Sequence, residues 1–127
     1  MKKIYLISML AAMICGSCQE KKAELYAREA KDMTEQCPMI LGKYIRMDSV
    51  AYFEPTNEFV YYYMMDSQMS MDSIEPKYVR QELLNQIKNS PEMMPYIKDS
   101  MTFRYVYRTA SSGEVVMDFR FEPKEFH

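Results

Sequence analysis

Residues 101–121 constrain the fold most strongly, because apolar and polar side chains alternate there with a period of two. The stretches 101–108 and 114–121 are each long enough for one strand, and the turn residues of 110–113 (A-S-S-G) separate them. A period of two places every second side chain on the same face of a sheet. The pattern therefore predicts a β-hairpin with one buried face and one solvated face, whose charged residues pair across the strands.

A second hairpin is predicted over residues 46–65. The stretch 46–53 is followed by turn residues at 54–58 (E-P-T-N-E) and by the apolar run 59–65 (F-V-Y-Y-Y-M-M). Because that run is apolar on both faces, it is either a central strand of the sheet or a strand with an exposed aromatic row.

Two helices precede the hairpins. Residues 23–36 contain no glycine or proline, and one apolar stripe recurs at helical spacing through Tyr26, Ala30, Met33 and Cys37, before Pro38 ends the helix. The second helix is expected to begin near Pro76, capped by Asp72 or Ser73, with a short helical turn after Pro91. Its apolar face is formed by Val79, Leu83, Leu84 and Ile87. The order αββαββ predicts an α+β domain over 23–127, with a four-stranded antiparallel sheet of two hairpins and helices on one face.

The N-terminus has the pattern of an export signal. Lys2 and Lys3 precede an apolar run over 4–14, which is shorter than the ~20 residues that a membrane span needs. The following Gly16-Ser17-Cys18 resembles the lipobox of bacterial lipoproteins, with Cys15 in place of the common leucine. The resemblance implies a signal peptide over 1–17, a lipid on Cys18 and an outer-membrane location in the cell envelope. Because residues 19–22 are polar and charged, 18–22 is interpreted as a short tether, with the first turn of a helix as the alternative. The alternative is a cleaved secretory signal with an incidental cysteine.

Charge and cysteine content exclude several classes of protein. The chain has 16 basic residues, of which two lie in the leader, so 14 remain against 18 acidic residues. This balance provides no basic surface for nucleic acid, and export argues against such a partner independently. With Cys15 removed and Cys18 lipidated, Cys37 has no partner for an internal disulfide. It is interpreted as a small buried apolar residue, with a reactive thiol as the alternative.

No catalytic constellation is present in the sequence. The single histidine is the last residue, His127, and three glycines are too few for a phosphate-binding loop. The sequence therefore predicts a protein that is not an enzyme and that needs no cofactor.

Tyrosines and methionines are the remaining candidates for function. Tyrosine is frequent in protein interfaces, because it combines a large apolar ring with a polar tip. The predicted protein interface therefore consists of Tyr61, Tyr62, Tyr63 and Tyr105. For each of these tyrosines, packing in the core is the alternative. Four methionines lie within eight residues and suggest Cu(I) binding as an alternative function, although methionine also replaces leucine elsewhere in this chain. These four are Met64, Met65, Met69 and Met71.

These features together predict a membrane-anchored envelope lipoprotein that binds another envelope protein. The αββαββ order resembles small exported α+β modules such as the PepSY and cystatin-like groups, and the leader and composition resemble small lipoproteins of Bacteroidota. No motif within 23–127 identifies one of these families, so no functional residue is transferred from them.

Overall fold

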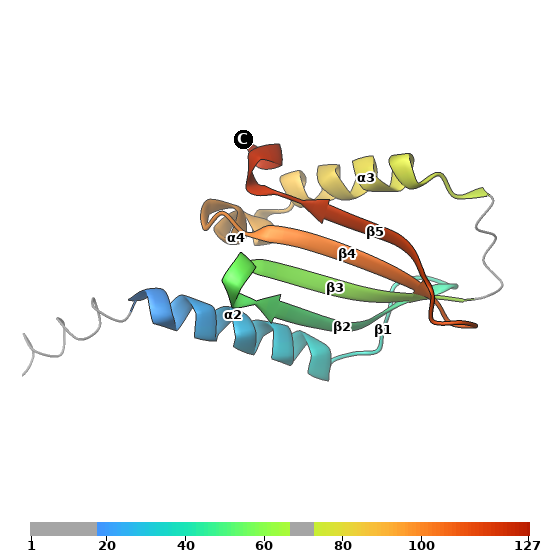
Figure 1. Cartoon of the computed structure of the whole chain (residues 1–127), viewed down its shortest axis with the longest axis horizontal. Helices are drawn as coiled ribbons and strands as arrows, with labels where there is room; N and C mark the ends of the chain where they lie inside the picture. The colour runs from blue at the N-terminus through green and yellow to red at the C-terminus, as the bar shows by residue number, and fades with distance from the viewer. Residues whose placement is uncertain (1–17, 67–72) are drawn as a thin grey trace, which may run out of the picture.

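The computed structural model describes residues 18–66 and 73–127, with side chains from residue 22 onward. The predicted signal peptide over 1–17 and two of the four clustered methionines, Met69 and Met71, lie outside the described residues. The elements follow in chain order (Figure 1): α2 (Cys18–Glu35), β1 (Met39–Ile40), β2 (Ile45–Phe53), η1 (Glu54–Thr56), β3 (Glu58–Met65), α3 (Pro76–Asn89), η3 (Pro91–Met93), α4 (Met94–Lys98), β4 (Thr102–Thr109), β5 (Val115–Phe121) and η4 (Pro123–Phe126).

The sheet has five strands in the order β1-β2-β3-β4-β5. The β2–β3 and β4–β5 hairpins are antiparallel as predicted, but β3 and β4 pair in parallel. The expected four-stranded antiparallel sheet is therefore wrong in two respects. The α3–α4 segment returns the chain to the end of the sheet where β3 began, and such a long crossover permits parallel pairing. The extra strand β1 has two residues, too few for an alternation pattern.

Helix α2 packs along β2 through the predicted apolar stripe. Tyr26 and Ala30 are buried, and Met33 and Cys37 are half-buried against the core. The hydroxyl of Thr34 donates to the carbonyl oxygen of Val50 at 2.8 Å and accepts from the Val50 amide at 2.9 Å, which fixes the helix against the middle of β2. The helix begins at Cys18, so the tether expected over 18–22 is helical.

Helix α3 lies beside the opposite edge of the sheet, next to β5 (Figure 1). Glu75 occupies its N-cap position and Pro76 its first turn, so the cap lies two residues after the expected cap Ser73. Asp72 lies outside the described residues. The Arg80 guanidinium lies 4.6 Å from the centre of the Phe121 ring and donates to the carbonyl oxygen of Arg120 at 3.0 Å. This contact occupies part of the exposed edge of β5.

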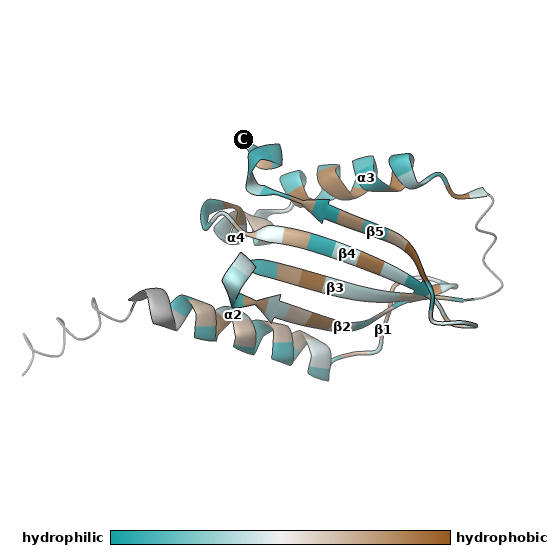
Figure 2. Cartoon of the chain, in the orientation of Figure 1, coloured by the Kyte–Doolittle hydropathy of each residue, from teal (hydrophilic) through white to brown (hydrophobic). Residues whose placement is uncertain are grey.

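The core lies between the helices and one face of the sheet. Alternate residues of β5 are buried in it, and Figure 2 shows polar and apolar residues following one another along this strand. The opposite face has no helix over it among the described elements and carries ion pairs. Arg104 forms two hydrogen bonds to Asp118 at 2.9 and 2.6 Å, and Arg120 bonds Glu58 at 2.9 Å. Cross-strand pairing was predicted for this face, although Glu58 was not expected as a partner.

Candidate functional site: a tyrosine ladder between two helices

Four tyrosine rings stack into a continuous column across the two central strands. The rings of Tyr61 and Tyr105 are 4.9 Å apart with an interplanar angle of 17°, and those of Tyr63 and Tyr107 are 4.7 Å apart at 13°. Tyr105 also stacks on Tyr63 at 6.0 Å and 11°, which joins the two pairs. We call these four residues the tyrosine ladder. The parallel register produces it, because Tyr61 is paired with Tyr105 and Tyr63 with Tyr107.

The ladder lies on the helical face of the sheet, between α2 and α3. The two helices follow opposite edges of the sheet and make no extensive contact with each other (Figure 1). Each helix presents half-buried apolar side chains packed against the core, including Met33 from α2 and Val79 and Leu83 from α3, and Cys37 packs there two residues after α2 ends. The strip of sheet that carries the ladder is therefore bordered by apolar side chains on both sides.

The ladder hydroxyls are neutral and unpartnered. Within the described residues, none of the four has a hydrogen-bond partner, although a tyrosine in a core usually finds one. No side-chain oxygen in this part of the chain is both fully buried and unpaired, so these hydroxyls keep contact with solvent. Burial raises the pKa of Tyr107 to about 12 and raises the pKa values of Tyr61, Tyr63 and Tyr105 further. The ladder therefore offers stacked rings with neutral hydroxyl groups.

Three of the four predicted interface tyrosines belong to the ladder, and one does not. Tyr61, Tyr63 and Tyr105 point to the helical face, whereas Tyr62 is half-buried on the opposite face beside Ser49. Tyr61 and Tyr105 are only 8% and 7% exposed, so Tyr63 is the most accessible ring. Tyr107 lies two residues after Tyr105 and therefore on the same face, which makes it the fourth ring of the ladder.

A hydrogen-bond cluster around Asp99 fastens the start of α2 to the neighbouring segments. The Asp99 carboxylate accepts hydrogen bonds from the Tyr26 hydroxyl and, at 3.0 Å, from the Lys22 ammonium. These two bonds lower the pKa of Asp99. The Asn57 amide donates to the Asp99 carbonyl oxygen at 3.0 Å and accepts from the Tyr52 hydroxyl at 2.8 Å. Because these groups bond one another across the start of α2, the end of β2 and the residues after η1 and α4, the cluster holds these segments together.

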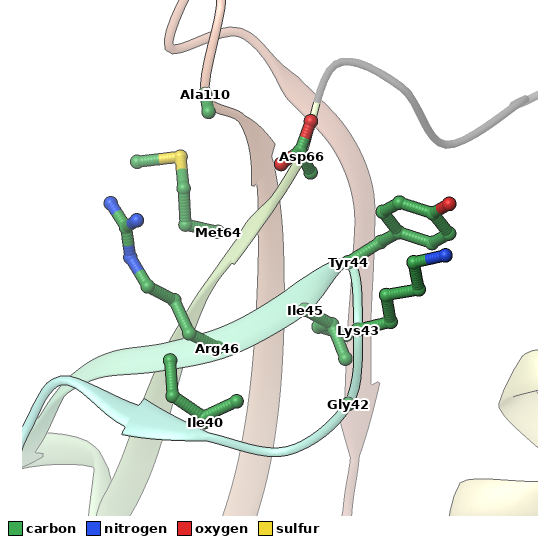
Figure 3. Close-up of a pocket in the computed structure, with 9 residues that line it drawn as sticks. All are labelled: Ile40, Gly42, Lys43, Tyr44, Ile45, Arg46, Met64, Asp66 and Ala110. Carbon is green, nitrogen blue, oxygen red and sulfur yellow. The ribbon is translucent and has the colours of Figure 1, made fainter.

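A pocket of about 200 Å³ lies at the other end of the sheet (Figure 3). Lys43 and Tyr44 point to one side of it, with the ammonium 5.2 Å from the Tyr44 ring centre, and Arg46 and Met64 lie on the other. Arg46 is already paired with Asp48 at 2.9 Å. The charged groups do not converge on one point, so the arrangement offers no catalytic geometry. The lining residues are Ile40, Gly42, Lys43, Tyr44, Ile45, Arg46, Met64, Asp66 and Ala110.

The two described methionine candidates, Met64 and Met65, lie on opposite faces of β3. Met64 is half-buried on the ion-paired face of the sheet, whereas Met65 is 1% exposed in the core on the helical face. The Cys37 thiol is half-buried and donates to the carbonyl oxygen of Met33 at 3.2 Å. Burial raises the pKa of this thiol, which disfavours the reactive thiolate. Across 18–66 and 73–127, no group of three or more His, Cys, Asp or Glu side chains is arranged to hold a metal ion.

None of the helices within 18–66 and 73–127 is long and apolar enough to cross a membrane.

Three solved structures share the fold of this chain. A protein from Pseudomonas aeruginosa described as secreted has a TM-score of 0.73 at 12% identity, and the match covers 83% of this chain and 92% of that one. The pilotin EpsS of the Vibrio vulnificus type 2 secretion system has a TM-score of 0.71 at 8% identity, covering 88% and 97%. The type II secretion system pilotin AspS from Vibrio cholerae has a TM-score of 0.65 at 11% identity, covering 88% and 98%.

Among curated proteins, none matches this chain. One protein family matches residues 21–117, which span the first helix, the whole of β4 and the start of β5. The chain therefore belongs to the family described as Domain of unknown function (DUF8479).

Proposed function

We propose that this protein is a non-enzymatic, lipid-anchored protein of the cell envelope that binds a segment of another envelope protein over the tyrosine ladder. The anchor is the lipid on Cys18, as the lipobox pattern implies. The outer membrane is the proposed location. Two proteins of similar fold are pilotins of type II secretion systems, and this supports an accessory role beside another envelope protein.

The unpartnered ladder hydroxyls carry this proposal. A side chain that packs on the accessible edge of the Tyr63 ring gains an apolar contact, while the hydroxyl groups are free to donate or accept hydrogen bonds. Stacked tyrosines also lose little conformational entropy on binding, because each has two rotatable side-chain bonds and the ladder already fixes them. The apolar borders formed by α2 and α3 suit an amphipathic segment, whose apolar side faces the ladder.

The test uses a photo-crosslinking amino acid at Tyr63 in living cells, with Tyr62 as its matched control. These adjacent tyrosines are both half-buried, but they point to opposite faces of the same strand. We expect one dominant envelope protein to be captured from position 63, and not from position 62. The adduct should be lost in the Cys18→Ala variant, because that variant is not held at the membrane. The folding of each variant is checked by its urea unfolding midpoint.

Two results would contradict the proposal. Capture from position 62 alone would place the interface on the open, ion-paired face of the sheet. Absence of a specific adduct from both positions, in variants that fold normally, would refute a protein-binding role for the central strand.

A further inference from the structure

The lipid anchor and the folded domain are joined by a helix. Helix α2 runs without interruption from Cys18 to the buried Tyr26, and eight residues of helix span ~12 Å. A flexible tether of the same length would let the domain turn freely, whereas a helix fixes one end of it near the anchor. This inference rests on the proposed function in one respect, which is that Cys18 carries the lipid.

The end of the domain next to Cys18 is formed by three elements. The start of α2, the turn η1 and the short helix α4 lie together there (Figure 1), and the hydrogen bonds of Asp99 with Lys22, Tyr26 and Asn57 hold them in place. The ring of Tyr26 also packs edge-on against Tyr96 of α4 at 5.6 Å. These contacts make this end a rigid surface.

A large apolar side chain is exposed in or directly next to each of these three elements. Leu25 in α2 is 43% exposed, Phe53 directly before η1 is 46% exposed and Met94 at the start of α4 is 41% exposed. We call these three residues the anchor-proximal surface. The nearby charges are mixed, because Lys22 is paired with Asp99 and the exposed Lys98 lies on the same short segment as the exposed Glu92.

We propose that the anchor-proximal surface rests on the lipid bilayer that holds the anchor, with its apolar side chains in the interfacial layer. Acyl chains on Cys18 start about two helical turns from Tyr26, so they bring this end of the domain, and no other, to the bilayer. Apolar side chains of this kind are favourable at the boundary between headgroups and acyl chains, where the apolar face of an interfacial element is buried by ~5–10 Å. Because the charges near this surface are mixed, its contact with the bilayer does not depend on anionic lipids, and zwitterionic lipids are sufficient.

This orientation determines where a partner meets the ladder. Strand β3 starts at the anchor-proximal end with Glu58 and runs away from it, so Tyr63 lies ~16 Å further along the strand. The ladder then faces sideways, above the headgroups, with α2 and α3 on either side. A partner segment that is itself close to the membrane can therefore reach it.

The test places a single tryptophan at either end of the domain, because the natural chain has none. Phe53→Trp reports on the anchor-proximal end and Val115→Trp on the opposite end, and the two native side chains are similarly exposed, at 46% and 49%. The full-length lipidated proteins are purified from membranes and reconstituted into phosphatidylcholine vesicles with or without bromine on the acyl chains.

We expect brominated lipid to lower the fluorescence of the Phe53→Trp protein at least about twofold and to leave that of Val115→Trp nearly unchanged, since only the former lies at the interface. Met94→Trp should behave like Phe53→Trp and serves if the latter does not fold. Equal quenching at both ends, or quenching at neither, would overturn the proposal.

The intact mass of the same samples shows whether Cys18 carries acyl chains. If it does not, the Cys37→Ser protein is attached through Cys18 to a maleimide lipid, and the same comparison of the two tryptophan positions tests the orientation. Crosslinking from Tyr63 reports separately on partner binding, so failure of the orientation and failure of the proposed function give different results.

Discussion

Replacing Phe59 with alanine is expected to remove a large part of the stability of the domain. The Phe59 side chain is 2% exposed, and its ring packs edge-on against three other rings. The ring centres lie 5.8 Å away for Tyr26, 5.4 Å for Tyr52 and 5.2 Å for Tyr96, so Phe59 joins α2, β2 and α4 to the start of β3.

The magnitude follows from the volume lost and from the ring contacts. Truncating a buried phenylalanine to alanine costs about 3–5 kcal/mol, and the dense packing around Phe59 favours a value near 4 kcal/mol. Phe59→Leu keeps most of the volume and loses the three edge-on contacts, each of which contributes ~0.5–1.5 kcal/mol. We therefore expect about 2 kcal/mol for leucine. A domain of this size has a total stability of about 5–15 kcal/mol.

The assay is urea unfolding of the Cys18→Ala protein, followed by far-ultraviolet circular dichroism. With an m-value of ~2 kcal/mol per molar urea, Phe59→Ala should lower the midpoint by ~2 M and Phe59→Leu by ~1 M. Phe53→Ala is the matched control, because Phe53 is 46% exposed and should change the stability by less than ~0.5 kcal/mol. A cost below ~1 kcal/mol for Phe59→Ala, or an equal cost for Phe53→Ala, would refute the packing argument.

Three further predictions concern titration and metal binding. Asp99→Asn should destabilise the protein by about 1–2 kcal/mol at pH 7. Hydrogen bonds lower the pKa of Asp99 from 3.8, so the difference in stability between the natural protein and the variant should shrink as the pH falls below that value. Urea unfolding midpoints of both proteins at pH 7 and pH 3 measure this difference. Burial raises the pKa of Tyr107 from 10.0 to about 12, so the stability that this residue contributes should be retained below pH 10 and lost as the pH rises toward 12. The measurement compares tyrosinate absorbance of the natural protein and the Tyr107→Phe variant, and a lower absorbance of the folded variant at pH 10 would contradict this. Titration with Cu(I) should show no binding tighter than ~1 µM, because Met64 and Met65 point to opposite faces of β3. Tighter binding that is lost in the Met64→Leu variant would support Cu(I) binding instead.

Much of the local structure was predictable from the sequence, because it depends on short periodic patterns. The stripe through Tyr26 and Ala30 identified the buried face of α2, and Pro38 predicted its end. The period of two identified β4 and β5, and the apolar stretches on either side of the turn residues 54–58 identified β2 and β3, each within one residue at each end. The apolar run 59–65 was correctly offered as a central strand, since β3 lies between β2 and β4.

Only the tertiary structure decided how these elements pair and which side chains meet. Parallel pairing of β3 with β4 joins residues that are 44 positions apart, and no local pattern encodes that register. The register places Tyr61, Tyr63, Tyr105 and Tyr107 in one stack, and the pleat of β3 sends Tyr62 to the other face. The sequence by itself thus determined the helices, the strands and a set of candidate tyrosines. The ladder arises only from contacts across strands that are distant in the chain, because side-chain stacking depends on strand pairing and not on local periodicity.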